Sequence, residues 1–169
     1  MDKQYVAHTQ SPVGLVEIKA CDEYITSVRL IKSGDKFLSG NESELPGHLR
    51  QCVAELGEYF AGTRTLFTVP LKQSGTDFQQ KVWRQLLEIP YGTTISYIEL
   101  SRRLGNSKLT RAAGGANSKN KLWIIVPCHR VIGADGSLTG YAGGLECKQW
   151  LLQHEANNSP GSNSLFATK

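Results

Sequence analysis

The sequence predicts a mixed α/β (α+β) fold made of two modules. Two β-prone segments and one amphipathic helical pattern fill the first part of the chain, whereas helical patterns dominate from residue 76 onward. Residues 73–75, Gln-Ser-Gly, lie between the two patterns and are typical of a joint. We therefore expect one module at 1–75 and another at 76–156, followed by a flexible tail at 157–169 that is rich in Asn and Ser.

Length and composition indicate a globular protein. The chain has 169 residues, of which 40% are hydrophobic and 20% charged. No apolar run approaches the ~18 residues of a membrane span, and the N-terminus lacks the basic and apolar regions of a secretory signal. We therefore expect no membrane partner and a cytoplasmic location in a bacterium or archaeon, or a nuclear one in a eukaryote.

The four cysteines are scattered along the chain, at positions 21, 52, 128 and 147. Because no Cys-x-x-Cys pair exists, they support neither a zinc ribbon nor a thioredoxin motif. Free thiols in a reducing compartment are the simpler expectation. We therefore predict no structural metal.

The first module is expected to be a small α+β unit without chemistry of its own. Val13–Ala20 and Tyr24–Ile31 are β-prone and closely spaced, which indicates a hairpin. Residues 33–47 are rich in Ser, Gly and Glu and predict a surface loop. Apolar residues then recur at helical spacing from Leu49 to Phe60, and a short strand at Phe67–Leu71 would be interrupted by a proline.

The second module begins with a helix that Thr76 or Asp77 can cap and that the Ile-Pro-Tyr-Gly run at 89–92 ends. Two further helices are expected at 94–104 and 108–118, and the turn between them contains a glycine. This pair has the outline of a helix-turn-helix. Three more elements follow: a strand at 124–126, a turn-rich hairpin at 132–137 and a last helix at 145–155.

Chemistry is concentrated in the stretch Ile124–Val131. Three apolar β-formers run into Pro127, where a strand should end because proline cannot donate to a sheet ladder. Cys128 then lies at a strand end or on a tight turn, and His129 and Arg130 follow at once. A free thiol of pKa ~8.5 is mostly protonated near neutral pH, and a neighbouring imidazole and guanidinium are the groups best placed to change that. The alternative is a buried, inert structural cysteine.

The charge distribution favours a polyanionic partner. The net charge is only +4, but residues 1–75 carry 8 Lys and Arg against 9 Asp and Glu, whereas residues 76–169 carry 11 against 6. Seven basic residues and no acidic residue lie between Arg102 and Arg130, a block that contains the second helix of the helix-turn-helix. The block favours binding to nucleic acid, with a solvated basic face as the alternative.

One motif and its surroundings resemble the 6-O-alkylguanine-DNA alkyltransferases. The motif is Pro-Cys-His-Arg-Val at 127–131, preceded by Asn120 and followed by Tyr-Ala-Gly-Gly at 141–144 and Trp-Leu-Leu-Gln-His-Glu at 150–155. The resemblance covers essentially all of residues 76–155 and extends more weakly to the N-terminal module. It implies a small ribonuclease-H-like α/β domain in the first module and a helical domain with a winged helix-turn-helix in the second.

The resemblance implies direct repair of DNA. Family members move an alkyl group from the O-6 position of guanine to their own cysteine, here Cys128, and O-4 of thymine is a further candidate site. The thioether is not reversed, so each molecule would act once and need no cofactor. The partner would be alkylated double-stranded DNA, approached through its minor groove with the base flipped out. The protein would act as a monomer.

The resemblance also implies roles for individual residues. His129 would take the thiol proton through a water, Glu155 would stabilise the imidazolium, and Tyr97 would donate to the departing guanine. Asn120 would fix the turn that carries the cysteine. The remaining roles concern the DNA: the base would be held by Tyr141, Ala142 and Val131, its place in the duplex would be filled by Arg111, and close approach of the helix to the groove would come from Ala112, Ala113, Gly114 and Gly115.

Two positions depart from the family pattern. Many relatives have proline at the position of Lys121, and several have proline or a small residue at the position of Trp123. An indole at the pocket rim should narrow the pocket, which predicts good reaction with methyl adducts and poor reaction with benzyl adducts. Two other functions stay open at this point: a helix-turn-helix regulator without chemistry, and a cysteine hydrolase that turns over repeatedly.

Overall fold

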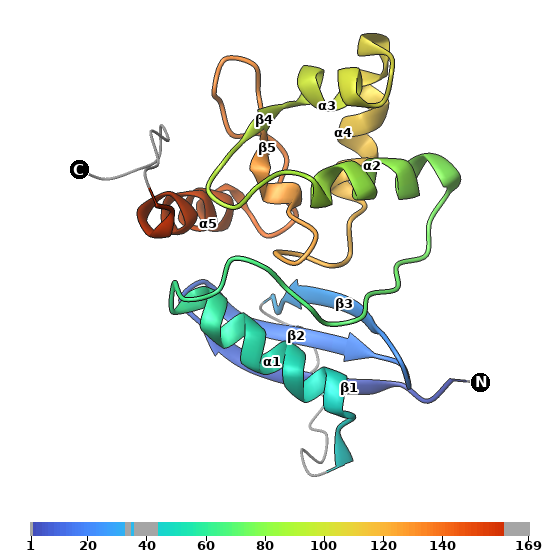
Figure 1. Cartoon of the computed structure of the whole chain (residues 1–169), viewed down its shortest axis with the longest axis vertical. Helices are drawn as coiled ribbons and strands as arrows, with labels where there is room; N and C mark the ends of the chain where they lie inside the picture. Colours follow the sequence, from blue (N-terminus) through green and yellow to red (C-terminus); the bar gives the residue numbers. More distant parts are fainter. Residues whose placement is uncertain (1, 33–34, 36–43, 161–169) are drawn as a thin grey trace. The chain divides into compact units, whose positions relative to one another are not determined.

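The structure is a computed structural model in which residues 2–32, 35 and 44–160 are described (Figure 1). The chain divides into two compact units, Met1–Gln73 and Ser74–Lys169. The loop expected at 33–47 and the tail expected at 157–169 lie mostly outside the described residues. Among the described helices, none has the length and apolar character needed to span a bilayer.

The first unit is a three-stranded antiparallel sheet with one helix across a face (Figure 1). The strands β1 (Tyr5–Ser11), β2 (Gly14–Ala20) and β3 (Ile25–Leu30) pair in sequence order. Helix α1 (Gly47–Phe60) contacts all three strands. The core lies between sheet and helix, because alternate strand residues and one helical stripe are apolar. Its members include Val16, Ile18, Ile25, Val28, Leu49, Cys52, Leu56 and Tyr59.

Two strand predictions in this unit differ from the structure. Strand β1 was not expected, since polar residues such as His8 and Gln10 weaken its apolar alternation; pairing with β2 in unbroken register stabilises it instead. The strand expected at Phe67–Leu71 is reduced to a single parallel bridge between Ile25 and Leu71. Pro70 has no N–H to donate, and its carbonyl accepts from the Ile25 N–H at 2.8 Å.

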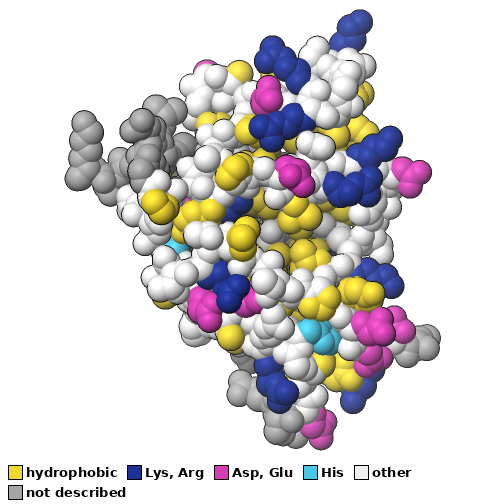
Figure 2. Space-filling view, viewed as in Figure 1, with side chains coloured by type: hydrophobic (Ala, Val, Ile, Leu, Met, Phe, Trp, Pro, Cys, Tyr) yellow, Lys and Arg dark blue, Asp and Glu magenta, His cyan; other side chains and the backbone are white. Residues whose placement is uncertain are grey.

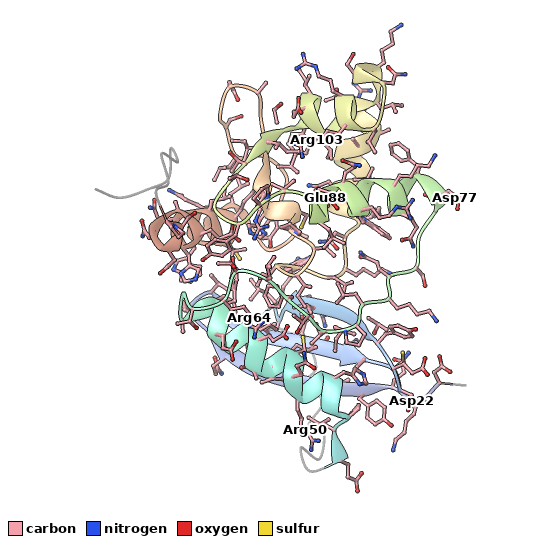
Figure 3. All side chains as sticks on the ribbon, viewed as in Figure 1. Asp22, Arg50, Arg64, Asp77, Glu88 and Arg103 are labelled. Carbon is pink, nitrogen blue, oxygen red and sulfur yellow. The ribbon has the colours of Figure 1, made fainter. Side chains whose placement is uncertain are left out.

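The connection that follows α1 is tied back to that helix. Arg64, labelled in Figure 3, lies just after α1. It pairs with Glu58 and with the buried Glu55. Glu55 also accepts from the Thr68 N–H at 2.9 Å. A buried carboxylate needs such partners, so residues 64–68 are held against α1.

The second unit contains four α-helices within its described part. Helix α2 (Asp77–Leu87) begins with a capping box, in which Thr76 and Gln79 satisfy each other's backbone N–H groups; Figure 3 marks Asp77 at its start and Glu88 just after its end. Helix α3 (Tyr97–Arg103) is capped by Ser96, whose hydroxyl accepts from the Glu99 N–H at 3.1 Å. Helix α4 (Thr110–Ser118) follows a short 3-10 helix at Ser107–Leu109, and α5 (Leu145–Asn158) is the last.

Helices α2, α3 and α4 pack on one another and form the helix-turn-helix part of this unit. The indole N–H of Trp83 in α2 donates to the carbonyl of Ala116 in α4 at 3.0 Å. A two-stranded parallel sheet of β4 (Ile95–Ser96) and β5 (Val131–Ile132) joins the start of α3 to the segment after Cys128. The hairpin expected at 132–137 forms its turn, with the Gly133 N–H bonded to the Ser137 carbonyl at 2.8 Å, but no strand returns among the described residues.

The strand predicted at 124–126 is wrong. The segment consists of tight turns, because the Ile125 N–H donates to the Trp123 carbonyl at 2.8 Å and the Val126 N–H to the Leu122 carbonyl at 2.9 Å. Its side chains are nevertheless buried. The β-forming residues therefore fill a core without joining a sheet, since β-propensity mainly reflects fit to a packed surface.

Candidate active site

Cys128 is carried on a turn that the backbone and one asparagine hold in place. Pro127 has φ −82° and ψ 64°, the geometry of an inverse γ-turn, and the Cys128 N–H donates to the Val126 carbonyl at 2.8 Å. Asn120 bonds to both sides of the loop: its amide NH₂ donates to the Val126 carbonyl at 2.8 Å, and its Oδ1 accepts from the Leu122 N–H at 3.0 Å. The side chain of Asn120 therefore holds the loop that leads to Cys128.

The same loop contains one strained residue. Ile124 has a φ of 71°, which a β-branched residue rarely adopts. Such a conformation costs about 1–3 kcal/mol and persists only where the surrounding structure imposes it. Strain of this kind clusters at functional sites.

A buried ion cluster lies directly after the cysteine. His129 Nε2 is 2.7 Å from Glu155 Oε1, and Arg130 forms a two-pronged pair with the same carboxylate, with Nε at 2.8 Å from Oε2 and Nη2 at 3.0 Å from Oε1. The third arm of the guanidinium donates to the Ile89 carbonyl at 2.7 Å. The Gly92 N–H also points to Glu155 Oε2, at 3.3 Å. Glu155 is thus the shared acceptor of the cluster.

The cluster sets the protonation of both of its titratable members. Burial alone would raise the pKa of Glu155, but the charges and hydrogen bonds of His129 and Arg130 hold it well below its usual range. Burial lowers the pKa of His129, against the raising influence of Glu155. Because a carboxylate only accepts, Nε2 carries the imidazole proton and Nδ1 presents its lone pair. Nδ1 is buried and has no hydrogen-bond partner in the described part of the chain.

Cys128 is only 4% exposed, and burial raises the pKa of its thiol to about 11. A hydrogen bond from Asn120, the charge of Lys148 and the backbone amides of Cys128 and His129 lower the pKa, but by less than burial raises it. The groups expected to act on the thiol were the His129 ring and the Arg130 guanidinium. The guanidinium is paired with Glu155, and the backbone of His129 is among the groups that lower this pKa. The resting thiol is therefore protonated near neutral pH.

Lys148 is a site residue that the sequence analysis missed. Its side chain is fully buried in α5, and its ammonium donates to the carbonyls of Val131 at 2.7 Å and Thr139 at 3.1 Å. Burial lowers its pKa to about 8, while Cys128 raises it. A signal for it was present: Lys148 precedes Glu155 by seven residues, two helical turns, so both lie on the same face of α5.

Tyr97 lies at the start of α3 and is half-buried. Its hydroxyl donates to the Thr139 carbonyl at 3.2 Å, the same oxygen that accepts from Lys148, and the Lys148 ammonium is 5.8 Å from the centre of its ring. The fold thus brings Tyr97, Lys148 and the segment after Cys128 together, although they are far apart in sequence.

The residues predicted to hold the base divide into a buried and an exposed group. Val131 is fully buried, whereas Ala142 is exposed. Tyr141 packs against Trp123, with ring centres 5.4 Å apart, and its buried hydroxyl has no hydrogen-bond partner among the described residues. A Cβ on Gly143 would lie 3.0 Å from the indole of Trp123. Glycine at this position therefore lets the backbone pass close to the indole.

The predicted DNA-contacting residues lie on α4. Arg111 and Ala112 are exposed, and Gly114 faces inward, where a Cβ would lie 3.6 Å from the ring of Tyr97. Figure 2 shows several Lys and Arg side chains over the α3–α4 part of this unit. The structure therefore places Arg111 on a helix of small residues that packs beside Tyr97.

The comparisons with known proteins agree for both units of the chain. Residues 4–73 match the description "6-O-methylguanine DNA methyltransferase, ribonuclease-like domain", and residues 77–157 match "6-O-methylguanine DNA methyltransferase, DNA binding domain". A methylated-DNA--protein-cysteine methyltransferase of Mycolicibacterium paratuberculosis is 44% identical over 156 residues, which cover 92% of this chain and 94% of that protein.

Solved structures are similar as well. The crystal structure of a Mycobacterium tuberculosis O6-methylguanine methyltransferase superposes with a TM-score of 0.82 at 40% identity, covering 98% of this chain and all of that one. The Mycobacterium tuberculosis protein in complex with DNA gives a TM-score of 0.80 at 42% identity over 91% of this chain and 94% of that one. With both halves matched and the reactive-cysteine motif in place, the chain belongs to the 6-O-methylguanine DNA methyltransferase family.

Proposed function

We infer that this protein repairs DNA by direct transfer of a methyl or other alkyl group from O-6 of guanine to Cys128. The observation that carries the proposal is the arrangement of Cys128, His129 and Glu155 in a chain of this family: the cysteine is followed by an imidazole whose Nε2 is held by a carboxylate at 2.7 Å. This is the nucleophile, base and orienting group that thiol chemistry requires.

The proposed reaction starts from the protonated thiol. The neutral imidazole of His129 accepts the proton of Cys128 at Nδ1 through a bridging water, and Glu155 stabilises the imidazolium that forms. The sulfur then attacks the alkyl carbon, the carbon–oxygen bond breaks, and its electron pair leaves with guanine. Tyr97 supplies a proton to the departing ring, which otherwise leaves as an anion. The thioether has no route back, so one molecule repairs one base.

Duplex DNA is the proposed partner, bound by a monomer through its minor groove. The exposed Arg111 would enter the stack where the damaged nucleotide rotates out, and the small residues Ala112 and Gly114 would let α4 lie close to the groove. Flipping costs a few kcal/mol and less for a base that already pairs badly, which favours a damaged guanine.

Stoichiometry separates this function from its alternatives. A duplex with a radiolabelled methyl group on guanine should transfer one equivalent of label per protein molecule and then stop. A DNA-binding regulator would transfer none. A cysteine hydrolase would release label into solution over many turnovers, so either result would exclude the repair function.

Benzyl adducts test the role of Trp123. Its indole packs against Tyr141, which reduces the room beside the base. We expect transfer from O6-benzylguanine to be slow and to speed up about tenfold in Trp123→Ala, since a pocket of changed size discriminates by roughly this factor. Methyl transfer should change much less. Fast benzyl transfer by the wild type that Trp123→Ala leaves unchanged would contradict this role.

Arg111 should matter more for duplex than for single-stranded DNA. If Arg111 stabilises the flipped state, Arg111→Ala should slow methyl transfer on a duplex about tenfold. The same variant should slow transfer on a single strand much less, because no base pair has to be broken there. Arg102→Ala is the matched control, because Arg102 is exposed and pairs only loosely with Glu99, at 3.9 Å. Arg102→Ala should change only the salt-dependent affinity for DNA. Equal losses on both kinds of DNA would make Arg111 a phosphate contact.

A further inference from the structure

Asn117 lies on the inner face of α4, and the mechanism above does not use it. It is 3% exposed, and its amide NH₂ donates to the carbonyl of Cys128 at 3.3 Å. It therefore connects the helix proposed to bind DNA with the backbone of the nucleophile.

Asn117 also lies next to Tyr97. Gly114, one helical turn earlier on the same face of α4, is the residue whose Cβ would touch the Tyr97 ring at 3.6 Å. Burial raises the pKa of Tyr97, whereas hydrogen bonding by the side chains of Thr139 and Asn117 lowers it. The amide of Asn117 carries two N–H groups, enough for the Cys128 carbonyl and the Tyr97 oxygen.

A second observation separates Asn117 from a packing residue. Its Oδ1 is buried and has no hydrogen-bond partner within the described residues. A buried polar atom without a partner is unfavourable, and an apolar side chain of the same shape would avoid that cost. The site thus keeps an amide although one of its two polar atoms has no partner within the described residues.

We propose that Asn117 is a positioning residue for the proton donor, in that its amide holds the Tyr97 oxygen and the Cys128 carbonyl in one unit and donates to the Tyr97 oxygen while the phenol gives up its proton. This inference rests on the function proposed above. The hydrogen bond from Asn117 makes Tyr97 a stronger acid in the transition state, because a hydrogen bond to the charged form of a group favours that form.

The protons and electrons of the step balance. The sulfur–carbon bond forms and the carbon–oxygen bond breaks, and the electron pair of the broken bond stays with guanine. Guanine takes the hydroxyl proton of Tyr97, leaving a phenolate that Asn117 stabilises. The proton that Cys128 gave to His129 returns to Tyr97 through water, so the net change is a thiol turned into a thioether and an alkylated guanine turned into guanine.

A double-mutant cycle tests the proposal. The single-turnover rate of methyl transfer from O6-methylguanine duplex is measured for the wild type, Asn117→Leu, Tyr97→Phe and the double variant. Asn117→Leu should slow transfer about tenfold, the effect of one hydrogen bond to a developing charge. In the Tyr97→Phe background the same exchange should slow it by less than about twofold, because the hydroxyl it serves is gone.

A leaving group that needs no proton gives the second readout. Alkylation of Cys128 by iodoacetamide releases iodide, so Asn117→Leu should leave its rate within about twofold of the wild type while methyl transfer from guanine falls. Asn157→Leu, the same exchange at an exposed position of α5, is the matched control and should leave both rates unchanged. Asn117→Ala replaces Asn117→Leu if thermal unfolding shows that the leucine variant does not fold.

The outcomes separate this inference from the function on which it rests. If the wild type transfers no methyl group, the proposed function fails. If the wild type transfers methyl but the Asn117 variants match it, the positioning role is overturned. Equal slowing in both Tyr97 backgrounds, or equal slowing of the iodoacetamide reaction, would show a structural role only and would also overturn it.

Discussion

Cys128→Ser protein is expected to bind methylated duplex DNA and transfer no alkyl group. A serine hydroxyl is a far weaker acid than a thiol, so the neutral imidazole of His129 cannot ionise it, and oxygen attacks a saturated carbon more slowly than sulfur does. Burial already raises the pKa of the Cys128 thiol to about 11, which places the site close to the limit of what the imidazole can deprotonate. The loss should therefore be complete on the time scale of the wild-type reaction.

Cys147→Ser is the matched control for this variant. Cys147 is also buried and free, and it lies on α5, whose Glu155 bonds to His129. Cys147→Ser should transfer one methyl group per molecule at close to the wild-type rate. Methyl transfer by Cys128→Ser, or its loss in Cys147→Ser alone, would place the acceptor elsewhere.

Glu155→Gln is expected to destabilise the protein by about 3–5 kcal/mol at pH 7, because it removes the only carboxylate in the cluster and leaves the buried Arg130 guanidinium without a counter-charge. Methyl transfer should slow as well, since the His129 imidazolium loses its partner. Urea unfolding of both proteins measures the stability difference. Glu146→Gln, at an exposed position near the start of the same helix, should change stability by less than about 0.5 kcal/mol.

The destabilisation should depend on pH with a defined sign. The pKa of Glu155 is lower in the folded protein than in the unfolded chain, so its contribution to stability is complete above the ordinary carboxyl pKa and is lost as pH falls below it. The difference between wild type and Glu155→Gln should therefore be largest from about pH 5 upward and shrink toward pH 3. A difference that stays constant or grows on acidification would mean that the carboxylate is not held ionised by the cluster.

Local sequence patterns predicted much of the fold. The mixed α/β class and the helix expected to be capped by Thr76 or Asp77 follow from short-range rules, and the structure confirms both, with Thr76 as the cap. The rules failed where pairing between distant residues decides the outcome. Strand β1 depends in this way on its register with β2. The strand prediction at 124–126 failed for a local reason: these residues form turns because their backbone bonds are made within the loop that Asn120 holds.

The candidate site shows the same division between near and distant residues. Cys128, His129 and Arg130 are consecutive and were found from their chemistry, whereas Glu155 was assigned through the resemblance. The sequence signal for Lys148 is its place two helical turns before Glu155, and none singles out Asn117. Only the fold brings the Lys148 ammonium to the Val131 carbonyl and the Asn117 amide to the Cys128 carbonyl.

Peptide mass spectrometry of the protein after incubation with a duplex containing one O6-methylguanine is the most direct test that the alkyl group ends on the Cys128 sulfur. We expect one methyl group in place of the thiol hydrogen on the peptide that contains Cys128, none on the peptides of the other three cysteines, and ordinary guanine in the recovered DNA. Restored guanine together with an unmodified Cys128, or a methyl group on any other residue, would contradict this expectation.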